Sequence, residues 1–449
     1  MKQITAMTIG GSDPSSGAGI QADLKAFSSL GIHGTTVLTC ITVQNTKTVK
    51  KIIPANPEDI RNQIEVIMED IPITHVKTGL LFQPEIAKIV AQAAKKYQWH
   101  LIVDPVLTAT SGDALSTSTL TDEIKKTLLP RSELITPNIA EAEALTQTPI
   151  STITAMKHAA KIIHNMGAKN IILKGGHLRG DHAYDVLYDG KMYTERVLPK
   201  IPDRKAHGSG CSFSALLTGY LAQNHSILSA FSQAKAVLWQ MIHSGYYIGK
   251  GSDVLHISTQ SVRDAPYDLP TPDHVETWIQ LSKVVSDLPS RLPLSFISEV
   301  GVNIGYAIPY AKTREEICSI NGRIVRSSEK PLRCGSLRFG SSKHIASIIL
   351  AAMSLFPETR CGMNIRYTPD HVSLIKETEY TTSSFDRANE PKDAVSTMDW
   401  GTKTALENKE NYPDFIYDTG AVGKEPMIRI LGTNPKNVLQ KLNDIIARI

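Results

Sequence analysis

Short apolar runs alternate with longer amphipathic segments along the first half of the chain. Short runs predict buried strands, and segments with an apolar residue every three or four positions predict helices. The predicted strands are Ile4–Ile9, Thr35–Thr42, His75–Thr78, Leu101–Val103, Leu134–Thr136, Asn170–Leu173 and Ala183–Tyr188. The predicted helices are Ile20–Leu30, Pro57–Met68, Pro84–Tyr97, Asp122–Leu129, Asn138–Leu145, Ile153–Met166, Cys211–Gln223 and Ile227–Tyr247. This alternation favours a mainly parallel, doubly wound α/β sheet, which binds ligands at the carboxyl ends of its strands.

The pattern stops at Ser261–Asp273, a segment that contains Pro266, Pro270 and Pro272. We interpret it as a linker, because proline interrupts both helices and strands. The composition also changes here, since residues 1–270 contain 6 of the 17 arginines and the rest of the chain contains 11. Four of these arginines fall within one short stretch: Arg323, Arg326, Arg333 and Arg338. Such a basic stretch is usually a solvated face, but arginine is also the side chain best suited to two-point contacts with anions.

The composition narrows the class of protein. The 449 residues are 41% hydrophobic and 20% charged, as in globular proteins with packed cores. A net charge of +4 is too close to balance for a protein whose main partner is nucleic acid. Five cysteines without a CxxC pair argue against a disulfide scaffold and a zinc ribbon. The N-terminus has no signal-peptide core, and the longest apolar run, Ile345–Phe356, is too short to span a bilayer. We therefore expect a cytoplasmic protein without a membrane partner.

Several strand ends in the first half carry polar residues or glycines. The loop Gly10–Gly19 has neither the P-loop nor the GxGxxG pattern, and it is as compatible with a structural turn as with a ligand. Asp23, in the first turn of the next helix, is compatible with an acid that simply stabilises the positive end of the helix dipole. Gln44 ends a strand, and its amide can both donate to and accept from an aminopyrimidine-like edge, although it is also compatible with an ordinary loop amide.

Two acids and a lysine follow further strands. Asp104 ends one strand, Glu141 lies one turn into a helix, and Lys174 precedes two glycines. Two carboxylates in one cleft can hold Mg²⁺, and a lysine can bind phosphate. A structural role is the alternative for either acid taken alone.

The segment Ala206–Phe213 places glycines directly before an apolar helix. Exposed backbone N–H groups and the helix dipole then form an anion hole. Cys211 lies at this positive end, where a thiol pKa falls, so we expect a thiolate. The alternative is a buried structural cysteine.

Seven motifs in order resemble hydroxymethylpyrimidine/phosphomethylpyrimidine kinases of the ribokinase-like superfamily. They are GGSDPSSGAGIQADLKAF, TVQNT, VKTGLL, VDPV, TPNIAEAEAL, LKGGH and HGSGC. The resemblance implies a three-layer α/β/α sandwich over 1–258 and two successive ATP-dependent phosphorylations of a pyrimidine, first at its hydroxymethyl group. The chain departs from the family pattern at Pro202, Asp203 and Lys205, close to where the nucleotide phosphates are expected.

The same resemblance implies roles for individual residues. The pyrimidine would be bound by Gly11, Asp23, Val43 and Gln44. Mg²⁺ would be held by Asp104 and Glu141, and the ATP phosphates by Asn138, Lys174, Gly208, Ser209 and Gly210. Cys211 would be the base for the first phosphorylation; the second needs a base less, because a phosphate monoester is already largely ionised.

The remainder resembles a second family, the ThiN-type thiamine-phosphate synthases. The matching stretches are SEVGVNIGYAIPYAKT, INGRIVR, LRFGSSKHIASIILAAM, MNIRY, FDR, WG and IYDTGAVGKEPMIRILG. The resemblance implies a smaller α/β domain over 277–449, behind a linker over 259–276. It also implies that hydroxymethylpyrimidine diphosphate and thiazole phosphate are joined to give thiamine phosphate and pyrophosphate.

Such a domain must bind anions, which requires cations and backbone N–H groups. We predict Arg323 and His344 as catalytic residues, with His344 neutral because it lies at a positive helix end. The predicted phosphate and substrate ligands are Ser341, Ser342, Lys343, Asn364, Arg366, Asp386, Arg387 and Lys424. Plain helix capping is the alternative for the two serines.

Two other functions remain open. The second domain is alternatively a sensor that binds thiamine phosphates without turnover. The first is alternatively a pyridoxal-type vitamin kinase, which shares the fold and the Gly-Cys signature. In each case we expect small-molecule substrates and a homodimer.

Overall fold

The computed structural model describes residues 3–107, 118–202, 204, 206–267, 269, 271–391, 397–407, 409–421 and 423–449. The chain forms two compact units, Met1–Ala265 and Pro266–Ile449. The segment interpreted as a linker has regular structure: it contains α9 (Thr259–Asp264), and α10 (Pro272–Arg291) begins within it. Pro272 occupies the first turn of α10, where a missing N–H breaks no hydrogen bond.

The first unit is built on a nine-stranded sheet in the order β3-β2-β1-β4-β5-β6-β7-β8-β9, as far as its residues are described. The strands are β1 (Thr5–Ser12), β2 (His33–Gln44), β3 (Val49–Pro54), β4 (His75–Thr78), β5 (His100–Val103), β6 (Ser132–Ile135), β7 (Asn170–Gly175), β8 (His182–Tyr188) and β9 (Tyr193–Pro199). The strands β2, β1, β4, β5, β6 and β7 run parallel, and antiparallel strands extend both edges. Consequently, the carboxyl ends of the parallel strands meet at one edge of the sheet.

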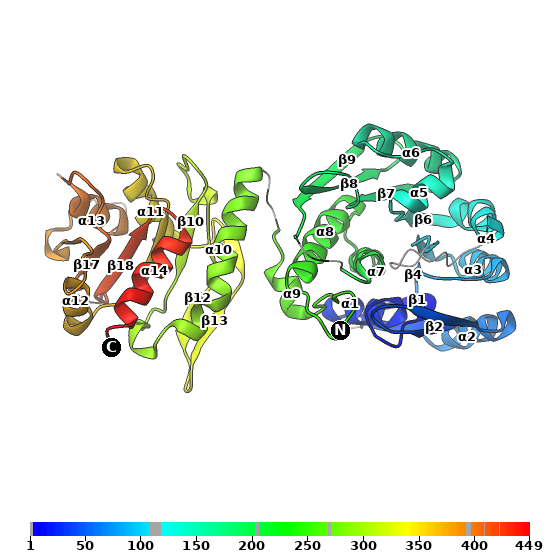
Figure 1. Ribbon diagram of the computed structural model, residues 1–449, viewed down its shortest axis with the longest axis horizontal. Helices are drawn as coiled ribbons and strands as arrows, with labels where there is room; N and C mark the ends of the chain where they lie inside the picture. Colours follow the sequence, from blue (N-terminus) through cyan, green and yellow to red (C-terminus); the bar gives the residue numbers. More distant parts are fainter. Residues whose placement is uncertain are drawn as a thin grey trace. The chain divides into compact units, whose positions relative to one another are not determined.

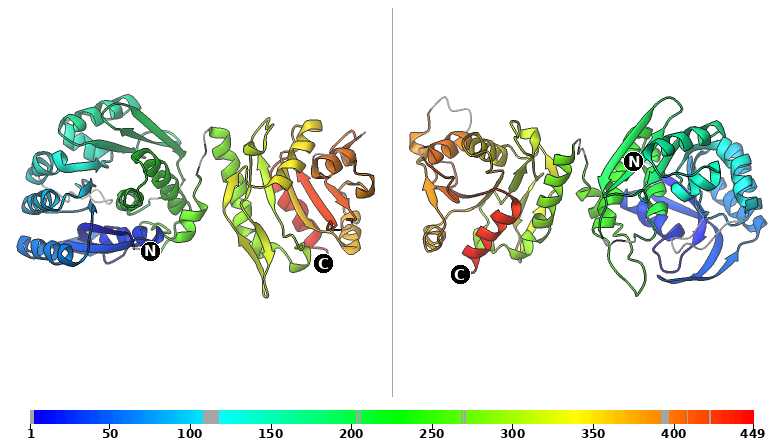
Figure 2. Two further views of the ribbon diagram at one scale, coloured as in Figure 1. Left: turned by 180° about the vertical axis from the view of Figure 1, so that it is seen from behind. Right: turned by 45° about the horizontal axis from the view of Figure 1, so that its top comes forward.

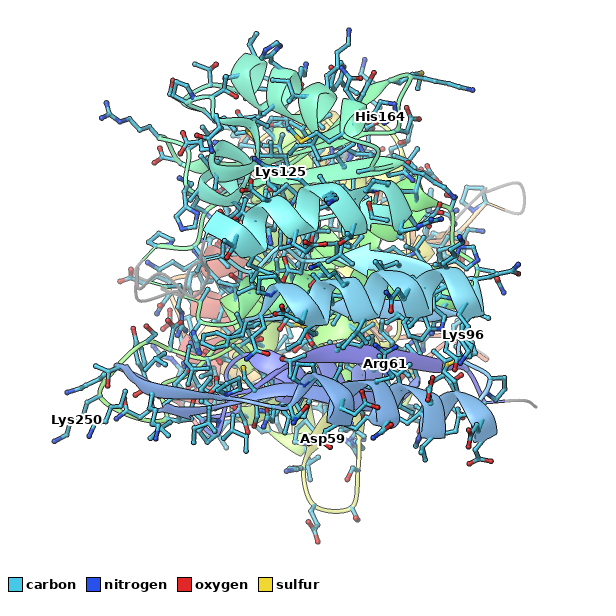
Figure 3. All side chains as sticks on the ribbon, turned by 90° about the vertical axis from the view of Figure 1, so that its right-hand side faces the viewer. Asp59, Arg61, Lys96, Lys125, His164 and Lys250 are labelled. Carbon is cyan, nitrogen blue, oxygen red and sulfur yellow. The ribbon has the colours of Figure 1, made fainter. Side chains whose placement is uncertain are left out.

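Helices cover both faces of this sheet. One face carries α2 (Pro57–Asp70), α3 (Pro84–Tyr97), α4 (Ser118–Glu123), η1 (Ile124–Leu128), η2 (Leu129–Arg131), α5 (Ile139–Thr146) and α6 (Ile153–Asn165). The other carries α1 (Gly19–Ser29), α7 (Ser209–Ala222) and α8 (Ile227–His243), as Figure 1 and Figure 2 show. Figure 3 looks onto the first layer, with Arg61 of α2, Lys96 of α3 and His164 of α6 labelled on its helices. This is the expected three-layer α/β/α sandwich.

The pattern-based prediction misses two strands and shifts some ends. β3 and β9 are absent from it, because these edge strands mix charged and apolar residues. The expected helix Asp122–Leu129 is divided between α4 and a π-helical turn, η1. The expected helix from Ile227 ends at His243 rather than Tyr247.

The second unit contains a seven-stranded sheet in the order β14-β11-β10-β15-β18-β17-β16 and a separate pair, β12-β13, within its described residues. The strands are β10 (Ile304–Ala307), β11 (Ile317–Ile320), β12 (Arg323–Arg326), β13 (Pro331–Cys334), β14 (Leu337–Phe339), β15 (Cys361–Arg366), β16 (Thr382–Ser384), β17 (Phe415–Asp418) and β18 (Met427–Gly432). Besides α10, its helices are η3 (Leu294–Phe296), η4 (Arg314–Glu316), α11 (Lys343–Leu355), α12 (Pro369–Lys376), η5 (Arg387–Asn389), α13 (Thr397–Leu406) and α14 (Pro435–Ile446). The sheet is antiparallel except for β16 and β17.

The apolar face of α11 builds much of the second core. Ile345, Ile348 and Ile349 are buried there with Phe385 and Leu431. This burial explains why the longest apolar run of the sequence is a core helix. Among the described residues, no helix has the length and apolarity needed to cross a membrane.

Candidate functional site

A cavity of about 1150 Å³ lies at the carboxyl ends of the parallel strands in the first unit. All but one of the residues predicted for this unit line it: Gly11, Asp23, Gln44, Asp104, Asn138, Glu141, Lys174, Gly208, Ser209, Gly210 and Cys211. Val43 does not line the cavity. Its side chain is 44% exposed, because successive residues of β2 point to opposite faces of the sheet.

Asp23 lines the cavity, but its carboxylate is already held by side chains of the protein. Its carboxylate accepts hydrogen bonds from Lys77 Nζ at 2.7 and 2.8 Å and from Thr8 Oγ1 at 2.6 Å, and the residue is 1% exposed. Burial opposes the charge of Lys77, but Asp23, supported by Cys211 and Asp104, outweighs burial and raises the lysine pKa, so we treat the pair as ionised. Lys77 was missed by the sequence prediction, although a lysine inside the buried strand β4 is a signal.

Asp104, Lys174 and Glu141 form a second charged group. Lys174 Nζ donates to Asp104 Oδ1 at 3.0 Å. Burial raises the pKa of Asp104, but the charges of Lys174 and Lys77, together with the hydrogen bonds from Lys174 and Thr136, outweigh burial and lower this pKa below its usual range. Glu141 forms a capping box with Asn138 at the start of α5, in which each side chain accepts the other residue's N–H. Burial, together with the charge of Asp104, raises the pKa of Glu141 to about 7.

The start of α7 forms the expected concave backbone turn. Gly208 is its N-cap with a φ of 80°, and a Cβ there would lie 1.8 Å from the Gly17 carbonyl oxygen. The ammonium of Lys174 lies beside the first turn of α7, since a Cβ at Gly210 would lie 3.2 Å from its Nζ. This segment therefore combines helix-end N–H groups with a cation, which suits phosphate.

The expectation that Cys211 is a thiolate at neutral pH is wrong for the protein without bound ligands. Burial raises the pKa of this thiol to about 11, and the nearby charge of Lys77 offsets burial only in part. The helix N-terminus is therefore not sufficient, and Cys211 is a neutral thiol at pH 7.

Asp13 and His207 connect the glycine-rich loop to the α7 segment. The Asp13 carboxylate accepts from the backbone N–H groups of Ser15, Gly17 and Ala18 and lies 3.2 Å from His207 Nε2. Burial opposes its charge, but His207 and the loop donors lower its pKa to about 2. The loop is thus held by an internal carboxylate that the sequence prediction missed. Asp203 and Lys205, near which the chain departs from the kinase pattern, lie outside the described residues.

A second cavity, of about 450 Å³, lies at the N-terminus of α11 in the second unit. The predicted residues that line it are Arg323, Ser342, Lys343, His344, Asn364, Arg387 and Lys424. Ser341, Arg366 and Asp386 are not among its lining residues. Ser341 bonds to Ser319 and the Arg338 carbonyl, and Asp386 caps η5, so both serve local structure.

The predicted neutral form of His344 agrees with a lowered imidazole pKa, although the causes are burial and neighbouring cations rather than the helix end. Burial lowers the imidazole pKa, and the positive charges of Arg323, Lys343, Arg387 and Arg429 lower it further. Ser342 caps α11 by accepting from the Ile345 N–H, so the predicted capping is present at the edge of the cavity. The cavity thus combines a neutral imidazole with several cations.

The polar wall of this cavity joins the predicted Asn364 and Lys424 to residues that the sequence prediction missed, among them Asn303, Glu390 and Glu425. Asn364 accepts from the Asn303 N–H and donates to the Gly301 carbonyl, so its amide holds the wall. Lys424 Nζ pairs with Glu390 at 2.7 Å. The carboxylate of Glu425 accepts from the N–H groups of Glu299 and Val300.

Comparison with known families decides what the two cavities belong to. A phosphomethylpyrimidine kinase family model matches residues 13–256, and a thiamine-phosphate synthase ThiN model matches residues 280–444. The bifunctional thiamine biosynthesis protein ThiDN of Methanocaldococcus jannaschii is 32% identical over 450 residues, 99% of this chain and 98% of that protein. The chain therefore belongs to the ThiDN family of bifunctional thiamine biosynthesis enzymes. Both resemblances inferred from the motifs are confirmed.

Other relatives match the kinase unit of this ThiDN-family enzyme, Met1–Ala265. The hydroxymethylpyrimidine/phosphomethylpyrimidine kinase of Bacillus subtilis is 40% identical over 248 residues, 55% of this chain and 92% of that protein. The structure of a Staphylococcus aureus pyridoxal kinase in complex with ADP is 32% identical, with a TM-score of 0.55, and covers 58% of this chain and 95% of that one. The ribokinase-like fold and an ATP-dependent kinase are thereby confirmed. The remaining unit, Pro266–Ile449, is the synthase unit.

Proposed function

We propose that the kinase unit phosphorylates 4-amino-5-hydroxymethyl-2-methylpyrimidine twice with ATP in the cavity at the strand ends. One observation carries this proposal: Gln44, Lys174 and Cys211 come from distant parts of the sequence and line one cavity. The Gln44 amide suits the aminopyrimidine edge, and the α7 N-terminus with Lys174 suits the phosphates. Asp23 acts indirectly here, because its carboxylate is held by Lys77 and Thr8.

In the first step the Cys211 thiolate removes the hydroxyl proton of the pyrimidine. The freed oxygen then bonds to the terminal phosphorus of ATP, and ADP leaves as the bond between that phosphorus and ADP breaks. Because Cys211 is a neutral thiol at pH 7, it must first release its own proton to solvent, and only the small thiolate fraction acts as the base. Its neighbour Lys77 favours the thiolate, although burial opposes it. In the second step the attacking oxygen belongs to a phosphate monoester that is already largely ionised.

The two acids in the kinase cavity fit a magnesium ion. Mg²⁺ is usually held by one or two carboxylates together with phosphates and water. Asp104 and Glu141 line one cavity, and the charge of Asp104 helps to raise the pKa of Glu141, which a cation between them would reverse. When bound, Mg²⁺ supplies charge neutralisation at the transferred phosphate. Lys174 provides a further cation to the same region.

In the synthase unit, Arg323, Lys343 and the α11 N-terminus bind the diphosphate of the pyrimidine substrate. The neutral His344 can donate its ring N–H to this leaving group. Departure of the diphosphate leaves a pyrimidine methylene cation, which the thiazole nitrogen traps. Such a reaction requires positioning and charge stabilisation more than a strong base.

A reconstituted assay tests both proposals together. Purified protein supplied with ATP, Mg²⁺, hydroxymethylpyrimidine and thiazole phosphate should produce thiamine phosphate. Accumulation of hydroxymethylpyrimidine diphosphate without thiamine phosphate would contradict the synthase proposal and favour a sensor. Faster turnover of pyridoxine than of hydroxymethylpyrimidine would favour the pyridoxal-type alternative.

We also propose that the protein is a homodimer through the exposed face of β2 and β3 in the kinase unit. Ile41 and Ile53 are paired across these strands, and with Val43 they are 42–49% exposed. These side chains share one face of the sheet, and an exposed apolar patch typically marks an interaction surface. Light scattering should give twice the chain mass for the unchanged protein and the single mass for Ile41→Asp. The cytoplasmic location and the absence of nucleic-acid and membrane partners stay predictions.

A further inference from the structure

A buried cluster of three charged side chains adjoins the synthase cavity. Asp418, at the end of β17, pairs with Arg387 through a 2.6 Å contact to Nε and with Arg429 through a 2.8 Å contact to Nη2. The side chains of Asp418 and Arg429 are fully buried, and that of Arg387 is 6% exposed. Of the three, Arg387 alone lines the cavity. It is therefore the residue through which the cluster reaches a ligand.

The pairing of the last two strands brings this cluster together. β17 and β18 are antiparallel, and Asp418 lies opposite Met427, two residues before Arg429. Side chains two residues apart in a strand share a face, so the acid and the arginine meet on one side of the sheet. Arg387 reaches the same acid from η5, which precedes both strands in the sequence. The long family stretch from Ile416 to Gly432 thus contributes two buried charges, Asp418 and Arg429, in addition to the exposed Lys424.

Two arginines share one carboxylate in this cluster. The nearby Glu425 is not paired with either arginine through its carboxylate: that group accepts from the N–H groups of Glu299 and Val300, and Arg387 bonds to the Glu425 carbonyl oxygen. Arg429 lies over the Phe385 ring at 5.0 Å, and its Nε has no hydrogen-bond partner among the described residues. A buried excess charge is costly unless an anion compensates it.

We propose that Asp418 and Arg429 are positioning residues, which hold Arg387 at the cavity as the ligand of a substrate phosphate group. This inference rests on the proposed synthase function and names a ligand for it. The anion is either the diphosphate of the pyrimidine or the phosphate of the thiazole. Kinetics with each substrate varied separately distinguish the two sources.

The variant Arg387→Gln tests the cluster most directly. It leaves Asp418 paired one to one with Arg429, so the synthase unit should unfold at the same temperature as the unchanged protein or higher. Losing a charge-assisted contact should raise the KM for one phosphorylated substrate at least about tenfold. Calorimetry measures the affinity of each protein for pyrophosphate. If Arg387 binds the diphosphate, Arg387→Gln should bind pyrophosphate at least about tenfold more weakly than the unchanged protein. If Arg387 binds the thiazole phosphate, the two proteins should bind pyrophosphate equally well. An unchanged KM for both substrates would overturn the proposal.

The variant Asp418→Asn tests the positioning role, and Asp414→Asn is its matched control. Asp414 pairs with the buried Lys441 at 2.6 Å in the same unit but does not line the cavity. Both variants should lower stability, whereas Asp418→Asn alone should raise the KM affected by Arg387→Gln, and Asp418→Glu should restore it in part. Equal kinetic effects of the two asparagine variants would reduce Asp418 to a structural residue.

Failure of the inference can be separated from failure of the proposed function. If the unchanged chain forms no thiamine phosphate, the synthase proposal fails by itself. Inorganic phosphate and pyrophosphate binding to unchanged and Arg387→Gln protein then still test the cluster. Equal binding of both anions by the two proteins would overturn it. Should Asp418→Asn fail to fold, the Arg387→Gln comparison remains decisive.

Discussion

At the scale of single residues, the surroundings of Cys211 set the demands of the first phosphorylation. Its pKa of about 11 leaves little thiolate at pH 7, so the rate of the first step should rise with pH between 7 and 9. Cys211→Ala should abolish this rise and slow the first step about 100-fold or more, because general bases contribute that much. Separate assays of the two phosphorylations check it. Equal slowing of both steps would contradict a role as base.

Glu141 makes the stability of the kinase unit depend on pH. Its pKa is raised from 4.5 to about 7, so the folded state holds the proton more tightly than the unfolded state does. The stability from this proton is fully present below about pH 4.5 and is lost as the pH rises through about 7. Glu141→Gln should remove this loss and be the more stable protein at pH 8, as measured by denaturant unfolding.

Magnesium provides the second readout for Glu141. Mg²⁺ should stabilise the unchanged kinase unit at pH 8, where the carboxylate is ionised, and stabilise Glu141→Gln less. The glutamine can still accept the Asn138 N–H, so the helix cap is retained as an internal control. Equal stabilisation of both proteins by Mg²⁺ would remove Glu141 from the metal site.

At the scale of elements, the start of α7 depends on its contact with the glycine-rich loop. A Cβ at Gly208 would overlap the Gly17 carbonyl at 1.8 Å, and the backbone there has a φ of 80°. Gly208→Ala should therefore displace the loop from the helix N-terminus and reduce both phosphorylations about 100-fold or more, the scale of losing one transition-state donor. Initial-rate assays of the kinase and the synthase check that only the kinase is affected.

Gly31 offers the matched control for this prediction. Its φ is 73°, similar to that of Gly208, but a Cβ there would meet nothing within 4 Å. Gly31→Ala should cost about 1–2 kcal/mol of stability from backbone strain and leave the phosphorylation rates unchanged. A comparable loss of kinase activity in both variants would attribute the effect to strain rather than to the loop contact.

At the scale of the whole molecule, each compact unit has its own cavity and its own chemistry. Arg323→Ala and His344→Ala should abolish coupling while leaving both phosphorylations within about twofold of normal, because neither residue lies in the kinase unit. Cys211→Ala should slow the first phosphorylation but leave coupling at the normal rate when hydroxymethylpyrimidine diphosphate is supplied directly. Coupling at the normal rate in both synthase variants would remove these residues from the mechanism.

The sequence by itself determined the two families, the layered α/β architecture of the first unit and most residues around its cavity. It could do so because strand–helix alternation is local and parallel strand ends meet at one edge. It also placed His344 at a helix N-terminus, whereas the burial and the neighbouring cations that lower its pKa come from the tertiary structure.

Only the tertiary structure decided the charge states and the partners of buried groups. Cys211 is a neutral thiol because burial outweighs the helix end, and Asp23 is already held by Lys77. Asp418 joins Arg387 and Arg429 through strand pairing that no local pattern reveals. Electrostatic environment depends on residues distant in the sequence, and the fold brings them within a few ångströms.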